Sequence, residues 1–289
     1  MNIGCTWDCT IRNNGTASYC MPALKELGHT VKHYQAMGEC QKHDFYLYVD
    51  DGRDDKKWLP PHPNAYWAID THLGYGYRLW KAAQFDRVFV AQKDAVEQFK
   101  KDGIKHVEWL PLACHPMAHP NKEELISRGF PEKDLTRRHQ IAFVGFLNDA
   151  KGEGFNSRVD YLDRLFAEFP QSWVAVNLFF EQMAVRFVQA QLGFNISIKQ
   201  DLNMRCFEVM STGTPLLTNR NVHGIGDLFE EGVDYFGYEG PDEMVEVAKL
   251  ALNDDTLRRT IAGTGFNRVR ARHTYKHRME TICEVMKHA

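Results

Sequence analysis

The residues of this sequence that are best suited to chemistry follow a short β-rich run near Asn195. A polar stretch comes next and leads into a helix-period segment, Met204–Ser211. A Gly-Thr-Pro turn, which contains Gly213 and Thr214, then returns the chain to another β-rich run. A strand that feeds a helix in this way gathers backbone N–H groups at the helix N-terminus, where they attract anions.

This segment has the residue types that a nucleoside diphosphate requires. The N–H groups of Leu202 and Asn203 could bind the phosphates, and the guanidinium of Arg205 could neutralise them. Helical spacing places Glu208 on the same face as Arg205, where its carboxylate could accept two ribose hydroxyls. The alternative is that Arg205 and Glu208 form an exposed ion pair on an ordinary packed helix.

A second constellation, Asp70-Thr71-His72, follows the buried-type run Tyr66–Ile69. Ligands of open α/β sheets bind outside the carboxyl ends of the strands, so Asp70 and His72 could face one crevice. A carboxylate beside an imidazole can act as an acid–base pair or bind sugar hydroxyls. The alternative is that Asp70 caps the next helix and His72 is merely exposed.

The turn after the first strand contains Asp8 and an Asn-Gly pair that ends at Gly15. Its position before a helix suits an anion or the close approach of a ligand. It matches neither the dinucleotide fingerprint nor the phosphate-binding P-loop. An ordinary β–α turn capped by Thr16 is the alternative.

Two acids, Asp50 and Asp51, end the run Phe45–Val49 and resemble a metal-binding Asp-x-Asp motif. The charges continue into Lys56 and Lys57, so a solvated charged loop is the favoured interpretation. We therefore predict no metal site here.

These residues must be positioned by a regular scaffold, and β-rich runs alternate with helix-period stretches along the chain. Such alternation predicts parallel sheets built from crossover units. In the first half the expected strands are Asn2–Cys5, Thr30–Tyr34, Phe45–Val49, Tyr66–Ile69, Arg87–Ala91 and Val107–Leu110, with helices over Ala17–Leu27, Tyr75–Ala83 and Lys93–Lys101. In the second half the expected strands are Ile141–Gly145, Val174–Phe179, Asn195–Ile198 and Pro215–Thr218, with helices over Tyr161–Phe169, Gln182–Gln191, Met204–Ser211 and Glu243–Leu252.

Prolines and mixed charges between Cys114 and His139 are typical of a linker. We therefore predict two doubly wound α/β domains, 1–118 and 119–272, facing a cleft, followed by a C-terminal segment 273–289. The tail from Thr256 is helical by pattern, with breaks expected at Gly263 and Gly265 and again near His273.

The composition is that of a soluble globular protein, since 44% of the 289 residues are hydrophobic and 25% are charged. The net charge of −3 excludes a protein that binds nucleic acid through its overall charge. Between Thr256 and Ala289, however, eight basic and two acidic residues give a net charge of +6. We expect a solvated helical face there, with contact to nucleic-acid phosphates as the alternative.

No apolar run approaches the ~20 residues of a membrane-spanning helix, and no Sec-type signal opens the chain. The seven cysteines are scattered, with Cys5 and Cys9 the closest pair, so they are expected to be reduced thiols. These features predict a cytoplasmic protein without a bound metal.

Several stretches resemble glycosyltransferases of the GT-B fold, and more narrowly the spore-maturation-protein (CgeB-like) family with a group-1-like C-terminal domain. The resemblance rests on Tyr66–His72, Phe85–Asp94, Trp109–Pro116, Arg205–Leu217, Asp227–Gly232 and His273–Tyr275. It implies two Rossmann-like domains facing a cleft. The first, 1–118, would bind the acceptor and the second, 119–272, the nucleotide sugar, while a helix in 273–289 would pack back toward the first.

For the donor, the resemblance implies a nucleotide-diphosphate sugar, a UDP- or GDP-sugar, transferred without a metal. Glu208 matches the ribose-binding second glutamate of an E-x7-E motif, and Gln200 replaces the first, which leaves retention or inversion open. Gly145 matches the glycine near the phosphates. Arg158, or alternatively Lys151, would supply a positive charge there.

For the acceptor side, the resemblance places Asp70 near the reacting sugar, with His72 and Asp8 as further candidates. The acceptor hydroxyl could belong to a polysaccharide, a glycolipid, a protein or a modified DNA base. A monomer or a dimer is compatible with the sequence. A non-catalytic nucleotide-sugar-binding module is the alternative function.

Overall fold

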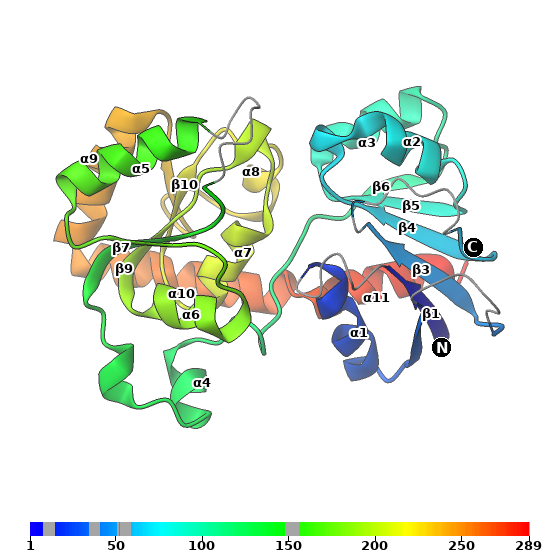
Figure 1. Cartoon of the computed structure of the whole chain (residues 1–289), viewed down its shortest axis with the longest axis horizontal. Helices are drawn as coiled ribbons and strands as arrows, with labels where there is room; N and C mark the ends of the chain where they lie inside the picture. The colour runs from blue at the N-terminus through cyan, green and yellow to red at the C-terminus, as the bar shows by residue number, and fades with distance from the viewer. Residues whose placement is uncertain (8–14, 35–40, 51, 53–58, 148–155, 289) are drawn as a thin grey trace. The chain divides into compact units, whose positions relative to one another are not determined.

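The computed structural model describes residues 1–7, 15–34, 41–50, 52, 59–147 and 156–288. The chain divides into two compact units (Figure 1). Unit 1 comprises Met1–Leu112 together with Tyr275–Ala289, and unit 2 comprises Ala113–Thr274. Each unit is an α/β layer structure with its own parallel sheet, as the alternation of β-rich and helix-period segments predicts.

Unit 1 is built on a six-stranded parallel sheet in the order β2-β1-β3-β4-β5-β6. Its strands are β1 (Asn2–Thr6), β2 (Thr30–Tyr34), β3 (Phe45–Val49), β4 (Asn64–Ala68), β5 (Arg87–Val90) and β6 (Val107–Trp109). Its helices are α1 (Ala17–Glu26), α2 (Tyr75–Ala82), α3 (Lys93–Lys101) and α11 (Tyr275–Met286), with a 3₁₀ turn η1 (Thr71–Leu73). Every residue of β3 and β4 is buried, because helices cover both faces of the sheet.

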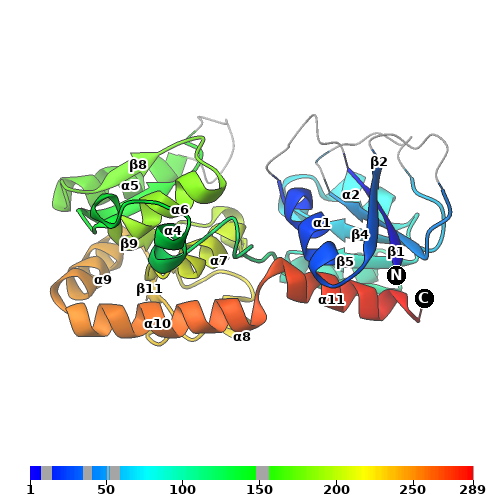
Figure 2. The same ribbon diagram turned by 90° about the horizontal axis from the view of Figure 1, so that it is seen from below.

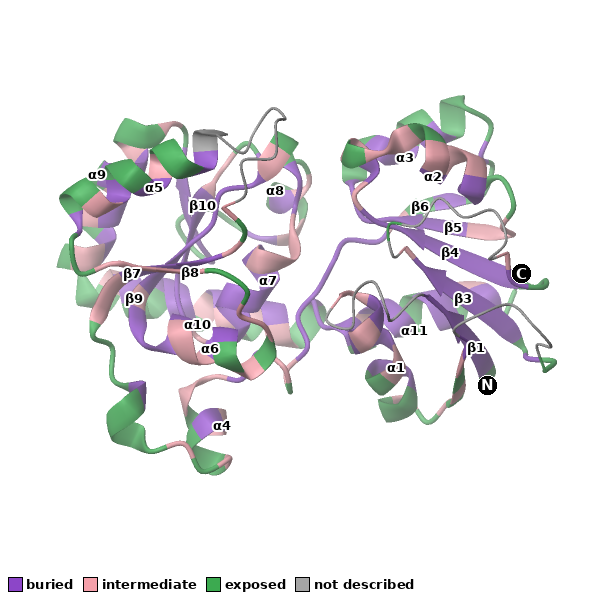
Figure 3. Cartoon of the chain, in the orientation of Figure 1, coloured by how far each residue is buried: buried purple, intermediate pink, exposed green. Residues whose placement is uncertain are grey.

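Unit 2 is built on a five-stranded parallel sheet in the order β11-β10-β9-β7-β8. Its strands are β7 (His139–Val144), β8 (Trp173–Ala175), β9 (Ala190–Phe194), β10 (Leu216–Asn219) and β11 (Phe236–Tyr238). Its helices are α4 (Lys122–Ser127), α5 (Asn156–Glu168), α6 (Phe180–Val188), α7 (Met204–Ser211), α8 (Ile225–Leu228), α9 (Pro241–Asn253) and α10 (Asp255–Arg272), with 3₁₀ turns η2 (Glu132–Leu135) and η3 (Ile198–Gln200). Figure 3 shows the buried strands inside the exposed outer faces of the helices.

The C-terminal helix α11 returns to unit 1 and packs against α1 and β4 (Figure 2). Tyr275 at its start is fully buried and stacks on Tyr19, with a ring-centroid distance of 4.8 Å. This return of the last helix agrees with the fold that the sequence predicts. Among the described residues, no helix has both the length and the apolar character needed to cross a bilayer.

Several expectations about local structure were wrong. The strand expected over Asn195–Ile198 lies earlier in the chain, because β9 ends at Phe194. The preceding helix, α6, accordingly ends at Val188 rather than at Gln191. Gly193 weakens the strand signal, but it is required there, because a Cβ at this position would lie 2.4 Å from Cγ1 of Val209.

The tail contains no break at Gly263 or Gly265, because α10 runs through both as one helix. Gly265 has a packing role, since an added Cβ would lie 2.4 Å from the backbone oxygen of Asp234. The break expected near His273 is present, between α10 and α11.

The segment expected to be a linker, 114–139, contains α4 and η2 and belongs to unit 2. A reciprocal capping box between Asn121 and Glu124 starts α4. Leu125 and Leu135 pack with Val188 in a buried cluster, so these short elements are part of the unit 2 core.

Candidate functional site

The strand order of unit 2 predicts where a ligand would bind, a place called the crevice below. If the five strands are numbered along the chain from β7, their order across the sheet is 2-1-3-4-5. The direction of winding therefore changes between β7 and β9, the first and third strands of this unit. In open α/β sheets of this order, ligands bind outside the carboxyl ends of the two strands at that point. The segments that lie there follow Val144 and Phe194.

Arg158, from α5, joins these two segments. Its Nη1 donates to the backbone oxygen of Phe146 at 3.0 Å and its Nη2 to that of Ile196 at 3.1 Å. Burial, followed by the charge of Arg205, lowers the pKa of Arg158. The positive charge of Arg205 thus acts on Arg158, which favours an anion beside these two segments.

The loop after β9 is held by side-chain amides and hydroxyls. Asn195 Nδ2 donates to Thr218 Oγ1 at 3.0 Å, and Asn203 Nδ2 donates to Asn195 Oδ1 at 3.3 Å. Asn203 is the N-cap residue of α7, yet its side chain makes no cap bond with that helix. Its backbone N–H donates to the oxygen of Asp201 at 3.0 Å, so that N–H is already used within the protein.

Two consecutive residues of this loop, Lys199 and Gln200, have left-handed backbones, with φ of 50° and 59°. Such conformations cost free energy in residues other than glycine and tend to occur at functional sites. Gln200, which replaces the first glutamate of the E-x7-E motif, has an exposed side chain.

Glu208 lies in α7 at the centre of a buried charged cluster. Its Oε2 is 2.6 Å from Nη1 of Arg205, and its Oε1 is 3.1 Å from Nε2 of His119. The side chain of Glu208 is 3% exposed and that of Arg205 is 20% exposed, so the interpretation as an exposed pair is wrong. Burial alone would raise the pKa of Glu208, but the charges of Arg205 and His119 outweigh it and hold that pKa below its ordinary value.

His119 is a residue that the sequence interpretation missed. Its Nδ1 accepts a hydrogen bond from the backbone N–H of His115 at 3.2 Å. Nε2 of the same ring faces Oε1 of Glu208 at 3.1 Å. The signal available in the sequence was a pair of histidines four residues apart, His115 and His119, in a segment that resembled a linker.

The remaining donor-side candidates are not all brought together. Gly145 directly follows β7 at the crevice, where an added Cβ would lie 2.7 Å from the Phe143 ring. Gly213 and Thr214 follow the C-terminus of α7, about 12 Å along the helix from its start. They lie at the amino end of β10, on the opposite edge of the sheet from the crevice.

In unit 1, Asp70 and His72 follow β4 at its carboxyl end, and both are half-buried. Asp70 has a left-handed backbone, with φ of 54°, and its side chain does not cap the following turn. Gln92 holds this turn, because its Oε1 accepts from the N–H of Thr71 at 3.1 Å and from its hydroxyl at 3.0 Å. The alternative that Asp70 is a helix cap is therefore wrong.

Asp50 is not part of a solvated loop, contrary to the favoured interpretation. Its side chain is 1% exposed, and its Oδ2 accepts from Arg78 Nε at 2.5 Å. The hydroxyls of Tyr66 and Tyr77 also donate to it, at 3.0 and 2.8 Å. The N–H of Ile69, directly before Asp70, donates to it at 3.1 Å, so Asp50 positions the candidate catalytic turn.

Other expected features have mixed outcomes. Gly15 is placed before α1, where its oxygen accepts from the Ser18 hydroxyl at 2.6 Å, and Thr16 makes no side-chain cap bond. Asp8, Cys9, Asp51 and Lys151 lie outside the described residues. The described cysteines are free and buried.

Three arginines of the basic tail make contacts within the protein, so the tail is not the solvated helical face that was expected. Arg270 pairs with Glu124 at 2.7 Å, and Arg268 pairs with Asp234 at 3.0 Å. Arg278 is buried and donates to the backbone oxygen of Pro111 at 2.7 Å. These positive charges serve the internal structure of the two units.

Comparison with known proteins shows what the chain is similar to. Residues 156–284 match a family described as glycosyl transferase-like. Comparison with curated protein sequences gives no match.

Solved glycosyltransferases are similar to nearly the whole chain. An alpha-glucosyltransferase in complex with UDP-glucose and DNA containing an abasic site has a TM-score of 0.66 and 9% identity, and covers 99% of each chain. HepE from Anabaena, in complex with UDP and glucose, has a TM-score of 0.66 and 12% identity, and covers 99% of each chain. Sucrose-phosphate synthase from Thermosynechococcus elongatus has a TM-score of 0.63 and 10% identity, with 100% of this chain and 98% of that chain covered.

The chain thus has the GT-B fold, and its resemblance to group 1 glycosyltransferases is confirmed. The narrower resemblance to the spore-maturation-protein (CgeB-like) family stays a prediction.

Proposed function

We propose that this protein transfers a sugar from a nucleotide-diphosphate sugar to an acceptor hydroxyl. The observation that carries the proposal is that Arg158 binds the segments after β7 and β9, while Arg205 lies in the first turn of α7, which follows β9. Both arginines lie in the segment that matches the glycosyl transferase-like family. Two of the similar solved structures contain UDP or UDP-glucose, which makes a UDP-sugar the first donor to test, ahead of a GDP-sugar.

In the proposed mechanism, the donor diphosphate lies at the start of α7, beside Arg205. The helix N-terminus and the two guanidinium groups stabilise the negative charge that develops as the bond to the sugar breaks. They supply charge that a divalent cation would otherwise have to supply, which supports metal-independent transfer. Glu208 accepts the ribose hydroxyls, because each of its oxygens has a lone pair besides the one used by Arg205 or His119.

Unit 1 contributes Asp70, with His72 beside it in the same turn. The carboxylate accepts the proton of the attacking hydroxyl or orients the reacting sugar. Asp50 and Gln92 fix the backbone on either side of Asp70, so the left-handed conformation is maintained. A folded Asp70→Asn variant that turned over at the wild-type rate would remove this role.

Calorimetric titration with UDP, GDP and UDP-glucose tests the donor site. We expect UDP to bind, and Arg205→Ala to weaken its binding by roughly tenfold or more, the effect of losing one charge-assisted hydrogen bond. Arg164→Ala is the matched control, because Arg164 is half-exposed and pairs with the exposed Asp242. If no nucleotide binds, or if both variants bind equally well, the proposed donor site is wrong.

The two alternatives have distinct outcomes in the same experiments. A non-catalytic binding module would bind nucleotide without hydrolysing or transferring the sugar from UDP-glucose. A DNA acceptor would require basic residues on the tail to contact phosphates. Arg268, Arg270 and Arg278 are already paired within the protein, so this alternative has less support.

A further inference from the structure

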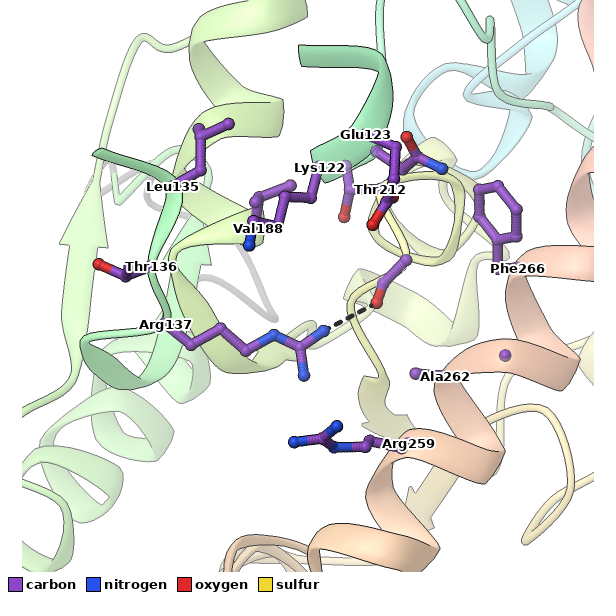
Figure 4. Close-up of a pocket in the computed structure, with 13 residues that line it drawn as sticks. Lys122, Glu123, Leu135, Thr136, Arg137, Val188, Thr212, Arg259, Ala262 and Phe266 are labelled. Atoms are coloured by element: carbon purple, nitrogen blue, oxygen red, sulfur yellow. Dashed lines mark hydrogen bonds between the residues drawn. The ribbon is translucent and has the colours of Figure 1, made fainter. Parts of the chain in front are cut away.

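A cavity of about 580 Å³ lies within unit 2, on the edge of the sheet opposite to the crevice (Figure 4). Arg137, Val188 and Gly213 line it, and they come shortly before β7, β9 and β10. The crevice lies after the same strands. The cavity is therefore separate from the proposed donor site, and its volume is in the range of small-molecule sites.

Positive charge gathers on one side of this cavity. Figure 4 shows the side chains of Arg137 and Arg259 extending toward the same space. Nη2 of Arg137 donates to the backbone oxygen of Gly213 at 3.2 Å. Within the described part of the chain, no carboxylate pairs with Arg137. Arg137 is exposed, but partial desolvation, followed by the charges of Arg258 and Arg259, lowers its pKa against the opposing charges of Asp255 and Glu123.

Three other charged groups line the wall, and one of them, Glu123, is a carboxylate whose charge acts on Arg137. Lys122 pairs with Glu132 at 2.7 Å, and Arg259 pairs with Asp255 at 2.6 Å. The side chain of Arg259 is 73% exposed, so a bound anion can compete for it. Of the basic side chains in the wall, Arg137 and Arg259 are therefore the two best placed to meet an anion.

The rest of the lining is mixed, with Asn121, Thr136 and Thr212 beside an apolar part. Leu135, Val188 and Ala262 are buried side chains at the cavity surface, and the ring of Phe266 is half-buried at its side. Gly263, on α10, leaves room, because a Cβ added there would meet no atom within 4 Å. A ligand that fits must therefore combine an anionic group with a compact, ring-sized body.

We propose that this cavity is a second ligand site, which binds a phosphate monoester carried on a ring. A phosphate monoester has a charge between −1 and −2 near neutral pH and matches the planar fork of a guanidinium group. Arg137 and Arg259 bind the phosphate, and the ring packs on Phe266 and Val188. The occupant contacts Thr212 and Gly213, which directly follow α7, the helix that contains Arg205 and Glu208.

Calorimetric titration with phenyl phosphate, ribose 5-phosphate, inorganic phosphate and phenol tests this proposal. We expect at least one of the two esters to bind more tightly than inorganic phosphate, and phenol not to bind. Tighter binding of phenyl phosphate identifies an apolar ring, and tighter binding of ribose 5-phosphate identifies a sugar ring. Equal binding of both esters and inorganic phosphate would overturn the role of the ring, and no binding by any of them would overturn the site.

Variants locate the binding. Arg137→Ala should weaken ester binding by about tenfold or more, since it removes a charge-assisted contact. Arg138→Ala, the neighbouring exposed arginine outside the cavity, should leave binding unchanged. Unchanged binding in Arg137→Ala, with a wild-type melting temperature in both variants, would place the ester elsewhere and overturn the proposal.

A substitution that adds bulk inside the cavity tests the same site without changing its charge. Gly263→Leu should fill part of the cavity, since its Cβ meets no atom within 4 Å, and it replaces a helix glycine by a better helix former. Gly76→Leu, at a helix glycine of unit 1 that also has open space around it, is the control. We expect only Gly263→Leu to abolish ester binding, while UDP titration of the same variants reports separately on the donor site.

Discussion

The contact between His119 and Glu208 makes a quantitative prediction. His119→Phe keeps a ring of similar size in a fully buried position but removes the donor to Glu208. The loss of a hydrogen bond to a buried carboxylate costs about 1.5–3 kcal/mol. The variant also leaves the N–H of His115 without its acceptor, which costs about 1–3 kcal/mol more. We therefore expect unit 2 to lose roughly 3–5 kcal/mol of stability.

Scanning calorimetry is suitable for this measurement, because two units with separate cores can melt as separate transitions. For a unit of about 160 residues, each kcal/mol lowers the melting temperature by about 2–4 °C, so the unit 2 transition should fall by roughly 6–20 °C. A double-mutant cycle with Glu208→Leu isolates the contact. The double variant should be more stable than the sum of the single losses implies, by about 1.5–3 kcal/mol.

His119→Gln is the conservative control, because its amide N–H can still donate to Glu208. UDP affinity should fall with His119→Phe and recover in part with His119→Gln, if His119 positions the ribose-binding carboxylate. Strictly additive losses in the cycle, or a UDP affinity that His119→Phe leaves unchanged, would refute the reasoning.

Three further predictions concern other buried positions. Asp50→Asn should destabilise unit 1 by about 3–5 kcal/mol in urea unfolding, because Arg78 is left buried without its counter-charge. Gly193→Ala should destabilise unit 2 by about 1–3 kcal/mol in the same assay, since the new methyl group meets Val209. Burial, then the charges of His119 and Arg270, lowers the pKa of His115 to about 4. The unfolded chain therefore binds this proton first, and unfolding titrations should show a stability loss between pH 6.5 and 4 that His115→Phe reduces.

The sequence was sufficient for those elements whose pattern is local. The strands Thr30–Tyr34 and Phe45–Val49 and the helices Lys93–Lys101 and Met204–Ser211 begin and end where periodicity predicts. In these segments the residues that face the core recur at the period of the element, so no distant contact is needed to assign them.

The sequence was insufficient where a residue's role depends on a distant partner. Asp50 resembled a surface acid, because its partner Arg78 is 28 residues away in the chain. His119 lies in a proline-containing segment, and its contact with Glu208 joins residues that are far apart in sequence. Gly265 resembled a helix break, although it is required by the backbone of Asp234 from another part of unit 2.

The division of the chain has a consequence for biosynthesis and for evolution. Unit 2 interrupts unit 1 as an insertion, and both borders of that insertion are tied together. Cys114 N–H donates to the oxygen of His273 at 3.1 Å on the unit 2 side, and Arg278 binds the oxygens of Pro111 and Leu112 on the unit 1 side. During translation the fold of unit 1 therefore cannot be completed until unit 2 has been synthesised. Until then, the surface of unit 1 that receives α11 is uncovered. The insert, whose ends are adjacent, can fold meanwhile, and the same adjacency would allow it to be exchanged or circularly permuted as one module.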